Sequence, residues 1–165
     1  MIDIYLYNKK YKQDTSMATK YIKGGDLMLF EKGTGSTYTA FAFAKSHSLQ
    51  IDADSLEVSS KDSGKWKEFL TTKLSWTINA EHLYVESDYD AMMQKLIARE
   101  PIEILFAIAT NSNDEDGKPE SGWTAGAGWK GSAVITSVSV NANDGEIASY
   151  SITLQGASPL TKQTA

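Results

Sequence analysis

The sequence predicts a mainly β fold of the α+β class, with one helix beside its strands. Apolar and polar residues alternate with a period of two through most of the chain, which is typical of strands that bury one face. Only residues 88–99 have helical spacing instead. A chain of 165 residues is long enough for one domain with a single hydrophobic core.

The strongest strand signals lie in the second half of the chain. Residues 102–109 place Ile or Phe at every second position. Residues 133–140 and 148–154 alternate in the same way, and Asn143-Asp144-Gly145 between them provides a turn, which predicts a β-hairpin. Weaker strand signals cover Leu27 to Glu31, Thr37 to Ala44, His47 to Asp52 and Lys73 to Ala80.

One amphipathic helix is expected over about residues 88–99. Ser87 and Asp90 have the spacing of a capping box, with an acid shorter than usual, and Pro101 prevents continuation. We expect the two methionines of this helix to fill the core, because a single helix on a sheet buries one stripe. The apolar residues at helical spacing are Tyr89, Met92, Met93, Leu96 and Ile97.

The charge of the chain is negative and unevenly distributed. The net charge is -5, but residues 1–23 carry five lysines against two aspartates, a net +3, which leaves 11 basic and 19 acidic residues, a net -8, in the remainder. This balance disfavours a protein that grips nucleic-acid phosphates, since such proteins concentrate Lys and Arg on one face. The absence of cysteine excludes disulfides, thiolate metal sites and thiol nucleophiles.

No targeting or membrane segment is expected. The apolar residues at the N-terminus are interrupted by Asp3 and follow no basic residue, so they do not predict a signal peptide. No apolar run approaches the roughly 18 residues of a membrane-spanning helix. The expectation is a protein made in the cytoplasm and exported only as part of a particle.

Two patterns that could carry chemistry fail in their context. Gly126, Gly128 and Gly131 have the spacing of a dinucleotide-binding motif but precede a β-branched strand and no helix, so they predict a flexible loop between strands. The acidic run 114–116 before Gly117 lacks the first aspartate and twelfth-position glutamate of a calcium loop.

The remaining candidates for chemistry are two aspartates and two histidines. Asp52 and Asp54 also lack the pattern of a calcium loop, and His47 and His82 belong to no readable triad or metal motif. We therefore expect no catalytic, cofactor-binding or metal-binding residues, and the protein is not expected to be an enzyme.

The segment 59–69 is unusual because Trp66 and Phe69 lie in a polar, turn-rich stretch. Exposed rings of this size are uncommon on monomeric surfaces. They either fold back as a lid on the core or anchor the segment on another subunit, as aromatic residues do inside a polar rim. The candidate interface residues are Ser60, Lys61, Asp62, Ser63, Gly64, Trp66 and Phe69.

Residues 54–68, followed by Leu74-Ser75-Trp76-Thr77-Ile78, closely resemble the signature region of siphophage major tail proteins. Residues 132–138 and 148–156 resemble the closing hairpin of that family, and the similarity extends from about Gly25 to Lys162. The chain departs from the family at residues 71–74, Thr-Thr-Lys-Leu, where relatives often have a Pro-Gly pair before Ser-Trp.

The resemblance implies a tail-tube fold of two packed antiparallel β-sheets, sandwich-like or barrel-like, flanked by one helix. It divides the chain into an N-terminal arm (1–24), a tube domain (25–162) and a short tail (163–165). It also implies hexameric rings stacked into the tail tube of a virion, without catalysis or cofactors. The implied partners are further copies of the chain, tape-measure, tail-initiator and tail-terminator proteins, and DNA in non-specific transit, with no insertion into a membrane.

Two alternatives to a phage tube remain open from the sequence. The first is the tube of a type VI secretion or related contractile injection system, which shares the fold. The second is a β-sandwich binding module, for instance for carbohydrate. For a tube that passes DNA, we expect a neutral to acidic lumen, and we expect the lysines between Lys9 and Lys23 on an outer or ring-to-ring surface.

Overall fold

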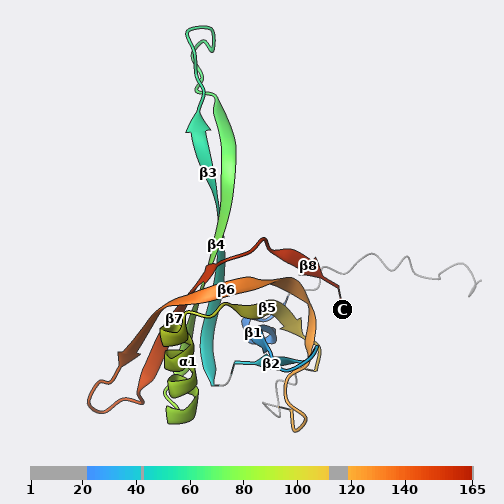
Figure 1. The fold of residues 1–165 in the computed structure, drawn as a ribbon, viewed down its shortest axis with the longest axis vertical. Coiled ribbons are helices and arrows are strands. Elements are labelled where there is room, and N and C mark those ends of the chain that lie inside the picture. Colours follow the sequence, from blue (N-terminus) through green and yellow to red (C-terminus); the bar gives the residue numbers. More distant parts are fainter. Residues whose placement is uncertain (1–21, 42, 112–118, 165) are drawn as a thin grey trace, which may run out of the picture.

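The computed structural model describes residues 22–41, 43–111 and 119–164. It confirms a mainly β fold with antiparallel pairing and a single α-helix among the described residues (Figure 1). Most of the N-terminal arm, with Lys9 to Lys20, lies outside these residues, as does the run Asp114 to Gly117. The strands are β1 (Leu27–Lys32), β2 (Tyr38–Ala40), β3 (Ala44–Glu57), β4 (Phe69–Leu83), β5 (Ile102–Ala109), β6 (Ala125–Asn141), β7 (Ser149–Gly156) and β8 (Thr161–Gln163), and the helix is α1 (Glu86–Ala98).

The strands form one continuous sheet in the order β2-β1-β5-β6-β7-β4-β3, with β8 also paired to β6. The long strand β6 connects the two halves, because it pairs with β5 through Ala133 and with β7 from Ala133 onward. The two packed sheets implied by the family resemblance are therefore two halves of a single hydrogen-bonded sheet. Side chains from both halves meet in one buried cluster, so the halves pack against each other.

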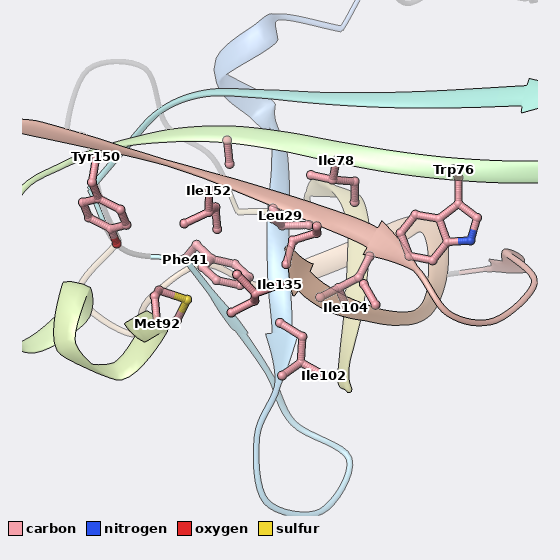
Figure 2. Close-up of a cluster of buried hydrophobic side chains, with 13 residues drawn as sticks. Leu29, Phe41, Trp76, Ile78, Met92, Ile102, Ile104, Ile135, Tyr150 and Ile152 are labelled. Atoms are coloured by element: carbon pink, nitrogen blue, oxygen red, sulfur yellow. The ribbon is translucent and has the colours of Figure 1, made fainter. Parts of the chain in front are cut away.

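The core lies between these two halves. Leu29 and Ile104 from β1 and β5 belong to the same buried cluster as Ile78 and Ile152 from β4 and β7, as Figure 2 shows. Met92 of α1 closes one end of this cluster, and the other methionine, Met93, is only half-buried. The alternating apolar residues of the sequence thus supply the inner faces of both halves.

The helix follows the prediction but begins differently. Its N-cap is Val85 and makes no side-chain capping bond, so the capping box predicted at Ser87 is wrong; the Ser87 hydroxyl instead lies 3.4 Å from an Asp88 carboxylate oxygen. At the other end, Arg99 adopts a left-handed conformation, with φ of 57°, and its N–H donates to the carbonyl groups of Lys95 and Leu96. The described residues contain no helix long and apolar enough to span a bilayer.

The expectation of a flexible glycine loop before residue 132 is wrong. Gly126, Gly128 and Gly131 lie inside β6, which begins at Ala125. A Cβ at Gly128 would lie 2.2 Å from the carbonyl oxygen of Phe106, and one at Gly126 would lie 2.9 Å from that of Ile108. The glycines allow close packing of strands, because any side chain there would collide with the neighbouring backbone.

Two of the weaker strand predictions also need correction. Residues 37–44 do not form one strand, since β2 ends at Ala40 and β3 begins only at Ala44. Phe43, between them, has a left-handed backbone conformation with φ of 52°. The strands expected over residues 47–52 and 73–80 are much longer than the local pattern indicated. They reach 14 and 15 residues as β3 and β4, which together form one extended hairpin.

Candidate functional site

The most prominent surface feature is the distal half of the β3–β4 hairpin, which projects away from the body of the protein (Figure 1). Residues 50–75, here called the projecting hairpin, are exposed throughout apart from Ser63. Of the polar, turn-rich segment 59–69, only residues up to Glu68 form a loop, because Glu57 pairs with Phe69 and β4 begins at Phe69. Strand pairing continues there without any core beneath it.

Backbone hydrogen bonds close the tip of the hairpin, residues 58–68. The N–H of Val58 donates to the carbonyl of Glu68 at 2.9 Å, and the hydroxyl of Ser59 accepts from the N–H of Glu68 at 2.9 Å. Ser60 and Ser63 bond to each other through both backbone and side chain. Of the predicted interface residues, Ser60 to Gly64 therefore form the turn itself, and Lys61, Asp62 and Gly64 are exposed on it.

Trp66 is 85% exposed and Phe69 is also exposed. The alternative that these rings fold back as a lid on the core is therefore wrong. Leu56 and Leu70, which are cross-strand partners in the hairpin, are exposed as well. The projecting hairpin thus presents a large apolar area on an element that is far from the core, as interface elements do.

Trp76 anchors the base of the hairpin to the body. Its ring is buried, and the indole N–H donates to the carbonyl oxygen of Ser158 at 2.7 Å. The hydroxyl of Ser158 in turn accepts from the backbone N–H of Ser132 at 2.8 Å. The projecting segment therefore extends from a fixed base, which is the arrangement needed for an element that carries contact residues.

A second surface is the outer face of the half-sheet β3-β4-β7-β6. Side chains on this face alternate with the core residues of the same strands. Most of them are hydroxyl or amide side chains, with Val134 and Leu83 at the margins of the face, and the polar part is here called the polar face. It consists of Ser46, Ser48 and Gln50 on β3, Thr77, Asn79 and Glu81 on β4, Ser151, Thr153 and Gln155 on β7, and Ser137 and Ser139 on β6.

Hydrogen bonds between strands tie the polar face together. Thr77 donates to the side-chain carbonyl of Gln155 at 3.1 Å, and Thr153 donates to that of Asn79 at 3.0 Å. Glu81, its one charged member, accepts a hydrogen bond from Lys45 at 2.8 Å. That bond and the charge of Lys45 hold the pKa of Glu81 below its usual range. The face is therefore polar and close to neutral.

The two histidines lie on the inner side of the sheet. The rings of His47 and His82 are 5.7 Å apart, and His82, which is fully buried, stacks on Tyr150 at 5.2 Å. Burial, with a smaller contribution from His82, lowers the pKa of His47 to about 4. Burial, with a smaller contribution from Asp88, raises the pKa of Tyr150 to about 12. Neutral forms of both groups are thus favoured, which suits a packing role.

Acidic residues do not gather into a metal site in the part of the chain that the structure describes, where no three His, Asp or Glu residues converge. Asp52 accepts a hydrogen bond from Gln50 at 3.0 Å, and Asp54 is exposed on the projecting hairpin. The candidate functional surfaces are therefore the projecting hairpin and the polar face.

Comparison with known proteins decides the family. The family model described as "Phage tail tube protein" matches residues 22–162. The chain belongs to the phage tail tube protein family. This confirms the family resemblance of the sequence and decides against a carbohydrate-binding module. No match was found among curated proteins.

Solved tail tubes share the fold of this tail tube protein. The tail of an empty gene transfer agent particle, refined with C6 symmetry, matches with a TM-score of 0.67 and 20% identity over 87% of this chain and 100% of the other. The SPP1 tail tube matches with a TM-score of 0.66 and 13% identity, over 88% of this chain and 80% of the other. The sheath–tube complex of an extracellular contractile injection system, PVC, matches with a TM-score of 0.59 and 17% identity, over 90% of this chain and 95% of the other.

The predicted residues of this tail tube protein cover only one of its two candidate surfaces. The predicted interface residues, Ser60 to Gly64 with Trp66 and Phe69, all lie at or beside the hairpin tip. The polar face was not predicted, although its signal is present in the sequence: the positions between the core residues of residues 46–50, 77–81 and 151–155 are almost all Ser, Thr, Asn or Gln. Only the strand register shows that these positions form one surface.

Proposed function

We propose that this tail tube protein assembles into hexameric rings, stacked into a virion tail tube, with the polar face lining the channel through which DNA passes. The polar face is the observation that carries the proposal. It extends across four neighbouring strands and presents hydroxyl and amide groups. Its one carboxylate, Glu81, is already paired with Lys45. The six-fold symmetry of the gene transfer agent tail supports the ring size.

A neutral lining suits DNA transit for a physical reason. Each lysine or arginine in contact with a phosphate releases counterions and strengthens non-specific binding, so a basic lining would retain DNA. Hydroxyl and amide groups are hydrated and carry no net charge. The carboxylate of Asp52, at the base of the projecting hairpin beside the polar face, repels phosphate weakly. A channel lined in this way is wetted but does not hold its cargo.

Ring closure would also cover the open edges of the sheet. The sheet ends at β2 on one side and at β3 on the other, and an unpaired edge invites pairing with another chain. Six copies joined through such edges form a closed wall in which no edge remains exposed. We propose that β3, which borders the polar face, forms part of the contact between neighbouring copies in a ring.

The hairpin tip is the proposed contact between copies beyond the ring wall. Ser60, Lys61, Asp62, Ser63 and Gly64 supply a polar rim, and the exposed rings of Trp66 and Phe69 supply apolar area. Burial of one such ring contributes on the order of 2 to 3 kcal/mol, and a closed assembly repeats the contact in every subunit. Tape-measure, tail-initiator and tail-terminator proteins are the proposed partners inside and at the ends of the tube.

Electron microscopy and sedimentation of the concentrated protein test this proposal. Six-fold rings or stacked tubes are expected, with or without a tail-initiator protein to nucleate them. A species that stays strictly monomeric at high concentration, even with the initiator present, would overturn it. A reconstructed ring with a continuous lysine-lined channel would overturn the assignment of the polar face while leaving assembly intact.

The tube of a contractile injection system is the second candidate, favoured by the match to the PVC sheath–tube complex. Such a tube would share the ring and the hairpin but carry protein instead of DNA. The neighbouring genes distinguish the two. Genes for a tape-measure protein and tail chaperones indicate a phage tail, whereas genes for a membrane-anchoring complex and an ATPase indicate secretion.

A further inference from the structure

The face of β1 that points away from the main core is apolar as well. Met28 and Phe30 belong to a second buried cluster on that face, and Tyr38 and Ala40 of β2 pack against it. Beside this cluster lies a groove of about 840 Å³, bounded by β2 and by residues 121–125 and here called the β2 groove. Clefts that hold a ligand usually have volumes of about 300–1,000 Å³, so the β2 groove is large enough for several side chains.

The β2 groove is apolar and uncharged. Met28, Tyr38, Phe43 and Trp123 supply apolar area, and none of the described residues that line it is a lysine, arginine, aspartate or glutamate. Phe43 is 57% exposed there and has φ of 52°, an unfavourable conformation for a residue with a bulky side chain. An apolar, uncharged occupant is the kind that fits these walls.

The strand β2 also has an open edge. The Phe41 N–H donates to the Leu29 carbonyl at 3.0 Å, and the Thr37 carbonyl accepts from the residue after β1 at 2.8 Å. Backbone groups alternate in direction along an antiparallel strand, so those of Tyr38 and Ala40 point away from β1. Within the part of the chain that the structure describes, no strand pairs with this edge.

The first residues of the chain have the pattern of a strand that would fit this edge. Residues 2–7 alternate Ile, Ile and Leu with Asp, Tyr and Tyr. A strand added to an edge places every second side chain on the same face, so the aliphatic set can face an apolar groove while the polar-tipped set faces the other way. Residues 112–118, which also lie outside the described residues, contain no apolar side chain and cannot fill the groove.

We propose that residues 2–7 pair with the open edge of β2 in their own subunit and place Ile2, Ile4 and Leu6 in the β2 groove. The pairing satisfies the outward backbone groups of β2 and covers apolar area that would otherwise invite aggregation. It is independent of the proposed function. The ring contact proposed for β3 lies at the other margin of the sheet, so the two assignments do not compete.

The connection to the body is long enough for this pairing. Residues 8–21 separate the segment from Ile22, and these 14 residues span up to about 46 Å at about 3.3 Å per residue. Gly25, close to the end of this connection, already lines the groove. A short tether gives the segment an effective concentration in the millimolar range, which favours its own groove over that of a neighbour. The lysines between Lys9 and Lys20 stay in the connection, outside the uncharged groove.

Hydrogen exchange of single backbone amides, measured by NMR on dilute protein, tests the pairing. The N–H groups of Tyr38 and Ala40 are expected to exchange at least tenfold more slowly in the natural chain than in Ile4→Asp, because a carboxylate cannot enter an apolar groove without a partner. Tyr5→Asp is the matched control and should keep the slow exchange, since its side chain belongs to the other face. The amide of Ile78 in the core should be equally protected in all three chains, which verifies the fold.

Three outcomes overturn the inference and leave the proposed function untouched. Rapid exchange of Tyr38 and Ala40 in the natural chain would show that the edge is open. Equally slow exchange in Ile4→Asp would show that another molecule or segment covers it. Protection that disappears on dilution would assign the groove to a second copy of the chain.

Cross-linking provides a second measurement, because the natural chain has no cysteine. Thr39 lies between the two outward-facing residues of β2, so its side chain is on the face assigned to Tyr5. A chain with Tyr5→Cys and Thr39→Cys is expected to form cross-linked monomers with a short bismaleimide. Asp144→Cys, exposed at the β6–β7 turn, replaces Thr39→Cys as the control. Covalent dimers in place of cross-linked monomers, or a yield equal to that of the control, would overturn the pairing.

Discussion

The indole ring of Trp76 lies directly over Gly156, where a Cβ atom would come within 2.3 Å of the ring carbon Cε2. Gly131 borders the same ring, and a Cβ there would lie 2.9 Å from Cζ2. The two glycines come from β7 and β6, so they form a notch in the sheet that accepts the side chain at the base of the projecting hairpin. Trp76 therefore links the orientation of the hairpin to the packing of the body.

Replacement of this glycine is expected to destabilise the subunit. Gly156→Ala should lower the free energy of unfolding by about 2 to 3 kcal/mol, because the added methyl forces the buried indole out of its position. Gly25→Ala is the control, since a Cβ at Gly25 meets nothing within 4 Å, and it should change stability by less than about 0.5 kcal/mol. Chemical denaturation of the monomer measures both. Equal effects would show that the notch is not tightly packed.

Truncation of the exposed ring at the tip is expected to separate folding from assembly. Trp66→Ala should leave the melting temperature of the monomer nearly unchanged, because the ring is 85% exposed, and should abolish or strongly slow tube formation. Trp66→Tyr retains a large ring and should assemble at close to the normal rate. Thermal melting and light scattering on the same samples test this, and a Trp66→Ala chain that polymerises normally would contradict it.

A positive charge on the polar face is expected to hinder DNA without hindering assembly. Ser48→Lys should form normal tubes, but DNA release from particles that carry it should be at least tenfold slower at low salt, with partial recovery as the salt concentration rises. Ser48→Glu is the matched control and should not slow release. Equal release rates for the two variants would contradict the placement of Ser48 in the channel.

Acid is expected to destabilise the subunit through His47. Its pKa is about 4 in the folded protein and near 6.5 when exposed, so between these values the unfolded chain binds a proton that the folded chain does not. Stability should therefore be complete above about pH 6.5, fall by on the order of 3 kcal/mol as the pH drops toward 4, and change little through this group below that.

The variant His47→Gln isolates this contribution, because its side chain stays neutral throughout. Its stability should depend less steeply on pH than that of the wild type over the same window. Denaturant unfolding at a series of pH values measures the slope. Identical slopes would show that His47 is not the group responsible.

The period-two pattern of the sequence was sufficient to predict the strands that have one buried and one exposed face. The β6–β7 hairpin was predicted because apolar and polar side chains alternate there, and α1 because its spacing changes before Pro101. The same period predicted β5, although Leu105, Ala107 and Ala109 on its second face are also buried. The family resemblance added the tube fold and its assembly. The candidate interface residues, Ser60 to Gly64 with Trp66 and Phe69, were predicted from composition alone, because two large rings stand there among serines and a glycine.

Only the tertiary structure shows the features that depend on the register between segments distant in the sequence. Gly131 and Gly156 are 25 positions apart in the sequence, yet both border Trp76, so their role as a notch is invisible along the chain. The polar face has the same origin, because strands that are remote in sequence bring single small side chains into one surface. A linear pattern records which face of a strand is buried, whereas only the pairing of strands determines what lies beside it.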